Sequence, residues 1–293
     1  MAHAGVGMRQ KLGREMAIPR LPPRFGKLQT RSFGPPRPCG KLWAGNESRG
    51  RVQMSDERQF GAPLPGWTPP RPPDAATMAG RHARLERLCP TAHAADLYQA
   101  NRADDRIWDY MGYGPFASEA DYRHWAESMA PEADPCFYAI IDRATGRAAG
   151  VASYLRITPA FGSLEVGHIC LSPALQGTIA ATESLFLMAD WAFAAGYRRY
   201  EWKCDALNLP SRRAAERLGF SYEGTFRQHM IYKGRNRDTA WFAMIDQDWP
   251  ALRRAYQNWL APGNFDATGR QKTRLSALTH PLLVSRDPVV GRP

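Results

Sequence analysis

The sequence has no run of 18 apolar residues, so it offers no candidate for a transmembrane helix. Nor does an apolar stretch follow a charged start, which argues against secretion by a signal peptide. Its five cysteines show neither CxxC nor His-rich spacing, which argues against a zinc site and against a disulfide framework. They are Cys39, Cys89, Cys136, Cys170 and Cys204. We therefore expect a cytoplasmic protein with no membrane partner and no bound metal.

Acidic residues are scarce at the N-terminal end. Residues 1–53 hold 11 Lys and Arg side chains against Glu15 and Glu47. The rest of the chain holds 28 basic and 26 acidic side chains, so most of the net charge of +11 belongs to this end. The remainder has no charge excess that would attract a phosphate backbone, and we do not expect nucleic acid as a partner. A nucleic-acid-binding role would rest on the N-terminal segment alone.

The N-terminal segment is also rich in proline, since 12 of the 24 prolines precede residue 81. Such a composition buries too little apolar surface to offset the entropy of the chain. We therefore predict that residues 1–78 are mostly a disordered, basic, Pro- and Gly-rich extension. Its Arg bias also resembles a transit peptide, and Met54 could mark an alternative translation start. A functionless extension is the preferred interpretation.

Residues 79–262 alternate strand-like and helix-like segments, which predicts an α+β domain with one crossover connection in its middle. The expected strands are residues 81–88, 136–141, 148–157, 163–171, 198–203, 220–232 and 239–246. The expected helices are residues 90–101, 118–129, 180–195, 211–218 and 248–260. Scattered basic residues and prolines follow, so residues 263–293 are expected to form a poorly ordered C-terminal tail.

One segment of the expected crossover has the pattern of an anion site. Gln176-Gly-Thr-Ile-Ala-Ala-Thr182 is typical of a small-residue loop that turns into a helix. The first N–H groups of a helix lack partners, and its positive dipole end attracts a phosphate. Small residues let the backbone approach that phosphate closely. An ordinary strand-to-helix turn has the same pattern, so this segment alone does not decide between the two.

A second segment follows about thirty residues later. Asn208-Leu-Pro-Ser211 begins a helix that ends at Gly219 and leads directly into a strand starting Phe220-Ser-Tyr-Glu-Gly224. Asn is a favourable helix cap, and Pro210 is tolerated in the first turn. A cap and a ligand contact use different atoms, so Asn208 can provide both.

Together the two segments resemble the acetyl-CoA cradle of GNAT N-acetyltransferases, in particular the ribosomal-protein (RimJ/RimL-like) branch. The resemblance covers about residues 80–260 and implies the GNAT fold, a mixed, mostly antiparallel sheet flanked by helices. It implies acetyl-CoA as co-substrate, and the sequence departs from it at Ile179, where the family's loop has its first glycine. The implied cofactor-binding residues are Ile169, Cys170, Leu171, Gln176, Gly177, Thr178, Ala180, Ala181, Thr182, Asn208 and Ser211.

The resemblance also implies how the reaction is catalysed. A backbone N–H near Ile169 to Leu171 would polarise the thioester carbonyl, Asn208 would bond near the pantetheine arm, and Ser211 would protonate the leaving thiolate. The amine also needs a base, and Glu165 is the leading candidate, directly or through a water, because burial would raise its pKa. Period-two alternation places His168 on the opposite face, so at most one of the two would face the substrate. The alternative interpretation is that Glu165 or His168 is a structural residue of its strand, held in an ion pair or by hydrogen bonds.

Several further residues leave alternatives open. Trp108, Tyr110, Tyr113 and Phe116 form an aromatic cluster that is either core or acceptor pocket. Glu223 and Arg227 on the strand at residues 220–232 are expected to be structural partners. Arg235 and Arg237 in the last hairpin would contact either an acidic acceptor or solvent. His229 is either exposed or part of the core.

The sequence therefore predicts an N-acetyltransferase that moves an acetyl group from acetyl-CoA to a primary amine by direct attack in a ternary complex. The amine would belong to a protein N-terminus, a peptide or an aminoacyl-like small molecule. The alternative is a catalytically inactive protein of the GNAT fold that acts as a CoA-binding or regulatory module. The oligomeric state stays open, a homodimer included.

Overall fold

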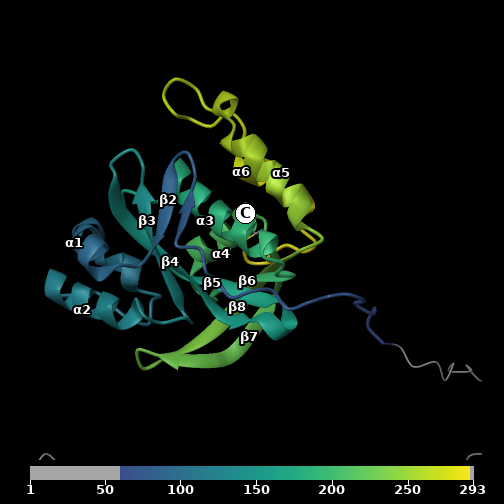
Figure 1. Ribbon diagram of the computed structural model, residues 1–293, viewed down its shortest axis with the longest axis horizontal. Coiled ribbons are helices and arrows are strands. Elements are labelled where there is room, and N and C mark those ends of the chain that lie inside the picture. The colour runs from purple at the N-terminus through teal and green to yellow at the C-terminus, as the bar shows by residue number, and fades with distance from the viewer. Residues whose placement is uncertain (1–59, 291–293) are drawn as a thin grey trace, which may run out of the picture. The chain divides into compact units, whose positions relative to one another are not determined.

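The computed structural model describes residues 60–290, and the expectations for residues 1–59 and 291–293 lie outside this range (Figure 1). The strands are β1 (Thr77–Ala79), β2 (Ala83–Arg87), β3 (Cys136–Asp142), β4 (Arg147–Thr158), β5 (Ser163–Leu171), β6 (Arg199–Asp205), β7 (Ser221–Tyr232) and β8 (Arg235–Ile245). The α-helices are α1 (Pro90–Asn101), α2 (Glu119–Met129), α3 (Ile179–Ala194), α4 (Leu209–Leu218), α5 (Trp249–Leu260) and α6 (Leu275–Thr279). Short 3-10 turns are η1 (Asp105–Trp108), η2 (Pro159–Phe161), η3 (Pro262–Asn264) and η4 (His280–Leu282).

Within the described residues the strands form one sheet in the order β1-β2-β3-β4-β5-β6-β8-β7. Every neighbouring pair is antiparallel except β5 and β6, which are parallel and joined by the crossover through α3. The sheet is therefore mixed and mostly antiparallel, and the predicted α+β class is confirmed. None of the helices between residues 60 and 290 is long and apolar enough to cross a membrane.

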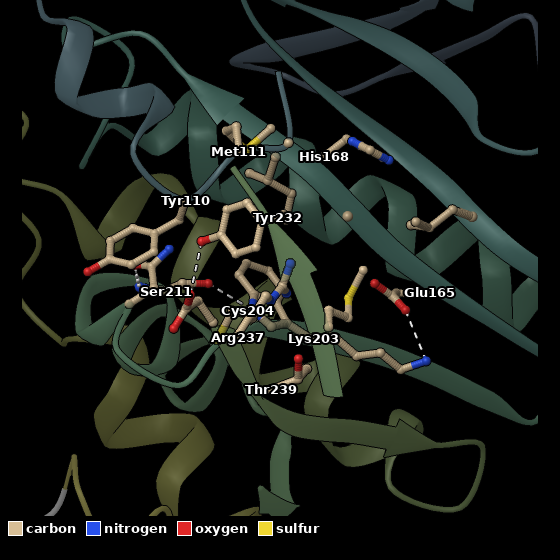
Figure 2. Close-up of a pocket in the computed structure, with 18 of the residues that line it drawn as sticks. Tyr110, Met111, Glu165, His168, Lys203, Cys204, Ser211, Tyr232, Arg237 and Thr239 are labelled. Atoms are coloured by element: carbon tan, nitrogen blue, oxygen red, sulfur yellow. Dashed lines mark hydrogen bonds and ion pairs between the residues drawn. The ribbon is translucent and has the colours of Figure 1, made fainter. Parts of the chain in front are cut away.

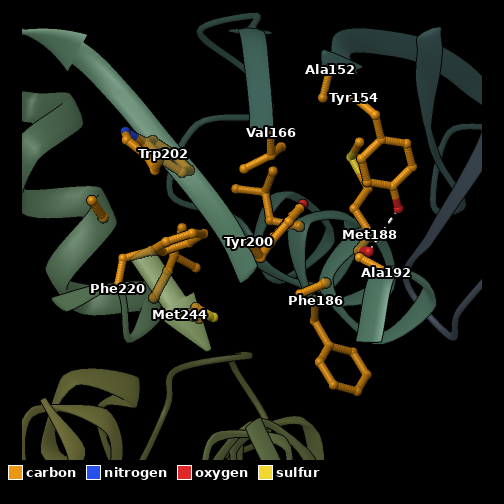
Figure 3. Packing of buried hydrophobic residues seen from close by; sticks show 14 of the residues in the cluster. Ala152, Tyr154, Val166, Phe186, Met188, Ala192, Tyr200, Trp202, Phe220 and Met244 are labelled. Atoms are coloured by element: carbon orange, nitrogen blue, oxygen red, sulfur yellow. Dashed lines mark hydrogen bonds between the residues drawn. The ribbon is translucent and has the colours of Figure 1, made fainter. Parts of the chain in front are cut away.

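Buried side chains of alternating strand positions pack on both faces of the sheet. Phe137 of β3 belongs to a cluster with residues of α1 and α2, such as Leu97 and Tyr122. Tyr154 of β4 belongs to the opposite cluster with residues of α3 and α5, and its hydroxyl donates to the carbonyl of Met188 at 2.7 Å (Figure 3). Each such buried side chain contributes about 1.5–3 kcal/mol, so helices on both faces fix the sheet between them.

The helix α4 begins and ends where the sequence predicts. Asn208 caps it, because its Oδ1 accepts the backbone N–H of Ser211 at 3.1 Å. Gly219 ends it in the left-handed conformation, with φ of 97°. A Cβ at that position would lie 2.5 Å from Cδ2 of Leu252 in α5, so only glycine allows both the turn and the close contact. The chain then enters β7 directly.

The parallel strands β5 and β6 pair over only part of their length. Their ladder ends at the pair Val166 and Trp202, whereas β5 continues to Leu171 and β6 to Asp205. The C-terminal halves of the two strands therefore diverge. Backbone groups of β5 beyond the ladder lack a strand partner on the edge facing β6, and a ligand inserted there can bond to them.

β5 also departs from regular alternation near its C-terminal end. His168 has a positive φ of 50°, and the register with β4 shifts between Val151 and Ser153. As a result Glu165 and His168 line the same pocket. The prediction that they face opposite sides was wrong, because alternation holds only along an uninterrupted strand and a bulge adds a residue to it.

The C-terminal segment, expected to be poorly ordered, packs on the domain in its described part. Leu275 of α6 is buried, and Thr279 donates through its hydroxyl to the carbonyl of Arg217 at 2.9 Å. Asp287 is fully buried and forms an ion pair with Arg212 of α4 at 2.6 Å. The expectation weighed local composition, whereas the order of this segment comes from contacts distant in the sequence.

The other end of the domain begins before residue 79. β1 pairs with β2 in antiparallel register, Met78 is buried, and the hydroxyl of Tyr138 donates to the carbonyl of Ala75 at 2.8 Å. Pro70 is buried as well. Residues 70–78 therefore pack on the folded domain, in contrast to the extension expected up to residue 78, because a proline-rich segment can still fill a groove on an existing surface.

Candidate active site

A cleft of about 1060 Å³ runs from the diverging ends of β5 and β6 along α3 and α4. Most of the residues predicted to bind the cofactor line it. These are Ile169, Cys170, Leu171, Gln176, Gly177, Ala181, Thr182, Asn208 and Ser211. The structure thus brings together two segments that the sequence separates by about thirty residues.

Thr178 and Ala180, also predicted for the cofactor, lie beside this cleft in structural positions. The hydroxyl of Thr178 accepts the backbone N–H of Ala181 at 3.1 Å and caps α3. Ala180 is buried in the core. Capping leaves other N–H groups of the first turn of α3 free to face an anion, and Gly177 before them adopts φ of 73°.

Two arginines on α4, which were not among the predicted site residues, add positive charge to the cleft. Arg213 and Arg217 are four residues apart, so both project from one side of the helix into the cleft. Arg217 donates to the hydroxyl of Thr182 at 3.1 Å, and burial lowers its pKa from the ordinary arginine value. Their spacing on a predicted helix was the signal that could have identified them.

Ser211 occupies a defined position at the inner end of the cleft. Its hydroxyl oxygen accepts the indole N–H of Trp202 at 3.0 Å, so its own proton is free to be donated elsewhere. Its backbone N–H donates to Oδ1 of Asn208, and Asn208, which also carries an NH₂ donor, lines the same cleft. The pair therefore offers two donors where the strands diverge.

A second, smaller pocket of about 240 Å³ adjoins this end of the cleft (Figure 2). The two cavities share Tyr110, Met111, Ile169, Trp202, Asn208 and Ser211. Figure 2 shows Tyr110 and Ser211 toward one side of the pocket and Glu165 on the other. A molecule in the pocket would thus lie between the carboxylate and the inner end of the cleft.

Glu165 lies in a buried network of charges. Its carboxylate contacts Arg156 of β4 at 2.7 Å and Lys203 of β6 at 3.1 Å. Lys203 also pairs with Glu201 at 2.7 Å, and its ammonium lies 3.8 Å from the ring centre of Trp241. Burial raises the pKa of Glu165, and the two cations offset part of that rise.

Glu201 shares Lys203 with Glu165 but titrates in the other direction. Burial alone would raise the pKa of Glu201, but hydrogen bonds from Lys203 and Arg199 outweigh it and lower the pKa. Arg199 in turn pairs with Glu223 at 2.5 Å. Glu223 is therefore structural, as expected, although its partner is Arg199 and the sequence analysis had paired it with Arg227.

His168 is held by aromatic contacts at the edge of the same pocket. Its ring stacks on Tyr113 with centres 5.6 Å apart and lies 5.0 Å from the ring centre of Phe137. Burial, with Arg156 nearby, lowers the pKa of His168 to about 4, so the imidazole is neutral at neutral pH. It can accept or donate a hydrogen bond there without carrying charge.

The aromatic cluster divides between core and pocket. Trp108 is buried in the core, and Tyr113 and Phe116 pack around it. Tyr110 instead lines both cavities, held by a hydrogen bond from its hydroxyl to the carbonyl of Leu207 at 3.2 Å. The core interpretation therefore holds for most of the cluster, and only Tyr110 faces the site.

The far wall of the small pocket comes from β8 and β7. Arg237 and Thr239 line it from β8, and His229 on β7 bonds to the Thr239 hydroxyl at 3.0 Å. Tyr232 donates to Asp205 at 2.9 Å, and burial raises the pKa of Tyr232 to about 12. Among residues 60–290 no group of three His, Cys, Asp or Glu side chains is placed to hold a metal ion.

Comparison with known proteins agrees with this architecture. A family model described as an acetyltransferase (GNAT) domain matches residues 83–221. The structure of a GCN5-related N-acetyltransferase from Brucella melitensis has 45% sequence identity and a TM-score of 0.72, and the match covers 74% of this chain and 99% of that chain. A protein from Chromobacterium violaceum, described as a probable acetyltransferase of the GNAT family, has 38% identity and a TM-score of 0.63, covering 66% of this chain and 98% of that chain. An N-acetyltransferase from Bacillus licheniformis is 24% identical over 159 residues, which is 53% of this chain and 89% of the relative.

The chain belongs to the GCN5-related N-acetyltransferase (GNAT) family. It is an acyltransferase of the acetyl-CoA-dependent kind, since this family uses acetyl-CoA. The cleft fits that co-substrate on its own features. It has an unpaired strand edge for an amide-rich arm, a helix N-terminus for a pyrophosphate, and guanidinium groups for further phosphate charge.

Proposed function

We propose that this protein transfers the acetyl group of acetyl-CoA directly to a primary amine while both substrates are bound. The observation that carries the proposal is the junction of the two cavities at Tyr110, Met111, Ile169, Trp202, Asn208 and Ser211. Bound acetyl-CoA supplies a thioester at this junction. An amine entering from the small pocket would meet it there without a covalent enzyme intermediate.

Hydrogen-bond donors of the backbone and of side chains would contact the carbonyl oxygen and the sulfur of the thioester. We assign polarisation of the carbonyl to the free backbone N–H groups of β5 between Ile169 and Leu171. The side-chain amide of Asn208 holds the pantetheine arm. The hydroxyl of Ser211, fixed by Trp202, gives its proton to the sulfur as the carbon–sulfur bond breaks and regains one from water, which balances the proton released by the amine.

The amine loses a proton when its nitrogen bonds to the acetyl carbon, and we assign Glu165 as the group that takes it. Because Glu165 and Ser211 lie on different sides of the pocket in Figure 2, we assign the transfer from the amine to Glu165 to a bridging water. Burial raises the pKa of Glu165 and makes the carboxylate a better base. Arg156 and Lys203 keep it ionised before the amine arrives.

The acceptor is an amine that also carries an acidic group. Arg237 faces the small pocket, and its Nε is buried with no hydrogen-bond partner among the described residues. Within residues 60–290 no carboxylate forms an ion pair with it, whereas Arg156 and Lys203 are both paired. A half-buried guanidinium without a partner favours an incoming carboxylate or phosphate. An aminoacyl-like small molecule or an acidic peptide N-terminus has this chemistry.

Thermal unfolding of the full chain with and without acetyl-CoA tests the function. At about 100 times its Kd, a ligand stabilises the fold by about 2.7 kcal/mol, which raises Tm by a few degrees. Asn208→Ala should reduce the shift, and mass spectrometry of a panel of amino acids and peptides should show N-acetylated products. No shift at millimolar acetyl-CoA would contradict the proposal.

A further inference from the structure

Part of the cleft wall comes from a segment that the family match at residues 83–221 does not include. After α5 the chain forms a loop over residues 264–273, which we call the C-terminal loop (Figure 1, yellow). Phe265, Gly269, Arg270 and Gln271 of this loop line the cleft together with Trp259 of α5. A segment outside the region matched by the family model therefore forms part of the wall of a cleft that is also lined by α3 and α4.

Hydrogen bonds within the C-terminal loop fix its shape. Asp266 accepts the backbone N–H groups of Thr268 and Arg270 at 2.9 and 3.0 Å. Asn264 accepts the backbone N–H of Thr273 at 2.9 Å and its carbonyl accepts that of Lys272 at 2.7 Å. The loop is thus closed at its base and at its turn, and it holds Arg270 in place.

An aromatic surface lies beside Arg270. Phe265 packs edge-on against Trp259, with ring centres 5.3 Å apart and planes at 82°. The indole N–H of Trp259 donates to Gln271 at 2.8 Å, which ties the loop to α5. A planar base can lie on such a surface while an adjacent phosphate contacts the guanidinium.

The charge of Arg270 is free to meet a ligand. Among residues 60–290 no carboxylate forms an ion pair with Arg270, Arg213 or Arg217, whereas the fourth arginine of the cleft, Arg106, pairs with Asp104 at 2.6 Å. Arg213 and Arg217 lie on α4, next to the N-terminus of α3. Arg270 lines the same cleft from the C-terminal loop, as do Phe265 of this loop and Trp259 of α5.

The position of the loop follows from the direction of the cleft. The reacting end is fixed at Ser211, and the residues of α4 that line the cleft continue to Leu218, about 10 Å further along the helix. Leu218 lines the cleft together with Trp259, and Trp259 contacts Phe265 and Gln271 of the C-terminal loop. A ligand with its thioester at Ser211 and its pyrophosphate at α3 would bring its nucleotide end to this loop.

We propose that the C-terminal loop recognises the nucleotide end of CoA, with Arg270 binding the 3′-phosphate of the ribose and Phe265 contacting the adenine. The inference rests on the proposed function, since it takes the cleft as the acetyl-CoA site. It assigns to this chain a phosphate contact outside the matched family region. The loop thereby distinguishes CoA from its analogue that lacks the 3′-phosphate.

Calorimetric titration of the full chain with CoA and with dephospho-CoA tests the inference without any acetyl acceptor. Wild-type protein should bind CoA about tenfold more tightly than dephospho-CoA, the effect of one charge-assisted contact. Arg270→Gln should abolish this preference and leave the Kd of dephospho-CoA unchanged. Arg274→Gln, an exposed arginine outside the cleft, should keep it.

Other results separate the possible failures. An unchanged preference for CoA in Arg270→Gln would overturn the inference. Loss of the preference in Arg213→Gln alone would also overturn it and would place the 3′-phosphate on α4. Equal weakening of both ligands by Arg270→Gln would assign Arg270 to the pyrophosphate and also overturn it. If wild-type protein binds neither ligand, the proposed function itself fails. Matching unfolding curves of the variants show that each is folded.

Discussion

Arg212 and Asp287 form a two-pronged ion pair inside the domain although 75 residues separate them in the sequence. Nε and Nη2 of the arginine lie 2.6 and 2.7 Å from the two carboxylate oxygens, and Asp287 is fully buried. Nη1 donates to the carbonyl of Ala206 at 2.6 Å. The pair joins the C-terminal segment to the helix that carries Asn208 and Ser211.

Asp287→Ala should lower the free energy of unfolding by about 3–5 kcal/mol, because it leaves a buried guanidinium without its counter-charge. Chemical denaturation of the full chain measures this. Asp74→Ala is the matched control, since Asp74 pairs with Arg71 on the surface and its loss should cost less than about 1 kcal/mol. Equal effects of the two variants would show that the buried pair is not important for stability.

Ser211→Ala should lower kcat about a hundredfold while the Kd of acetyl-CoA changes little. The hydroxyl would act only when the thiolate leaves, so its removal affects the reaction more than binding. Steady-state kinetics together with calorimetry separates the two quantities. Ser128→Ala on α2, away from both cavities, should leave kcat unchanged. A rise in Kd with unchanged kcat would assign Ser211 to binding alone.

Glu165→Gln should remove the acid limb of the pH profile of kcat/KM. The carboxylate is active when deprotonated, so wild-type activity is present above its pKa and is lost as the pH falls through it. Because burial raises that pKa, the limb should lie above the ordinary range of glutamate. Glu201→Gln is the control, since Glu201 bonds to the same Lys203 and should keep the limb. An acid limb that persists in Glu165→Gln would point to another base.

His168 should make the fold less stable in mild acid. Its folded-state pKa of about 4 lies below the usual 6.5, so between these pH values the unfolded chain binds a proton that the folded chain does not. The free energy of unfolding therefore falls as pH falls through this window, by about 1–3 kcal/mol from this group. Denaturation of wild type and His168→Gln at pH 7 and pH 4.5 should show a smaller loss in the variant. The exposed His124→Gln should behave like wild type.

Arg237→Gln should raise the KM for an amine acceptor that carries a carboxylate about tenfold. The same acceptor with its carboxylate converted to an amide should be used equally by both proteins. Arg235→Gln, two residues earlier and outside the pocket, is the control and should not change KM. An equal effect of Arg237→Gln on both acceptors would remove the acidic group from the proposed substrate class.

Much of the fold follows from local pattern. The expected strand at residues 163–171 has the same bounds as β5, and the helix expected at 180–195 is shifted by one residue from α3. The spacing of apolar residues and the capping residues determine such strands and helices in almost any tertiary context. β1 was missed because three residues, Thr77–Ala79, carry no pattern and become a strand only through pairing with β2.

The site was predicted less completely because its charges meet through the tertiary structure. Lys203 and Glu201 share a strand face by alternation, but the contact of Lys203 with Glu165 depends on the parallel pairing of β5 with β6. The left-handed conformation of His168 could not be predicted from the residue type, because positive φ values are uncommon for any residue other than glycine, even though histidine adopts them more often than most. Asp287 resembles any loop carboxylate until its distant partner is known.

The tie between Arg212 and Asp287 also sets an order of events during synthesis. The ribosome adds 75 residues after Arg212 before its counter-charge exists. Until then the guanidinium on α4 lacks the counter-charge that its burial requires. Arg212 can therefore be paired only after residue 287 has been added, well after every strand of the described sheet has been made, so α4, which lines the cleft, is tied down late.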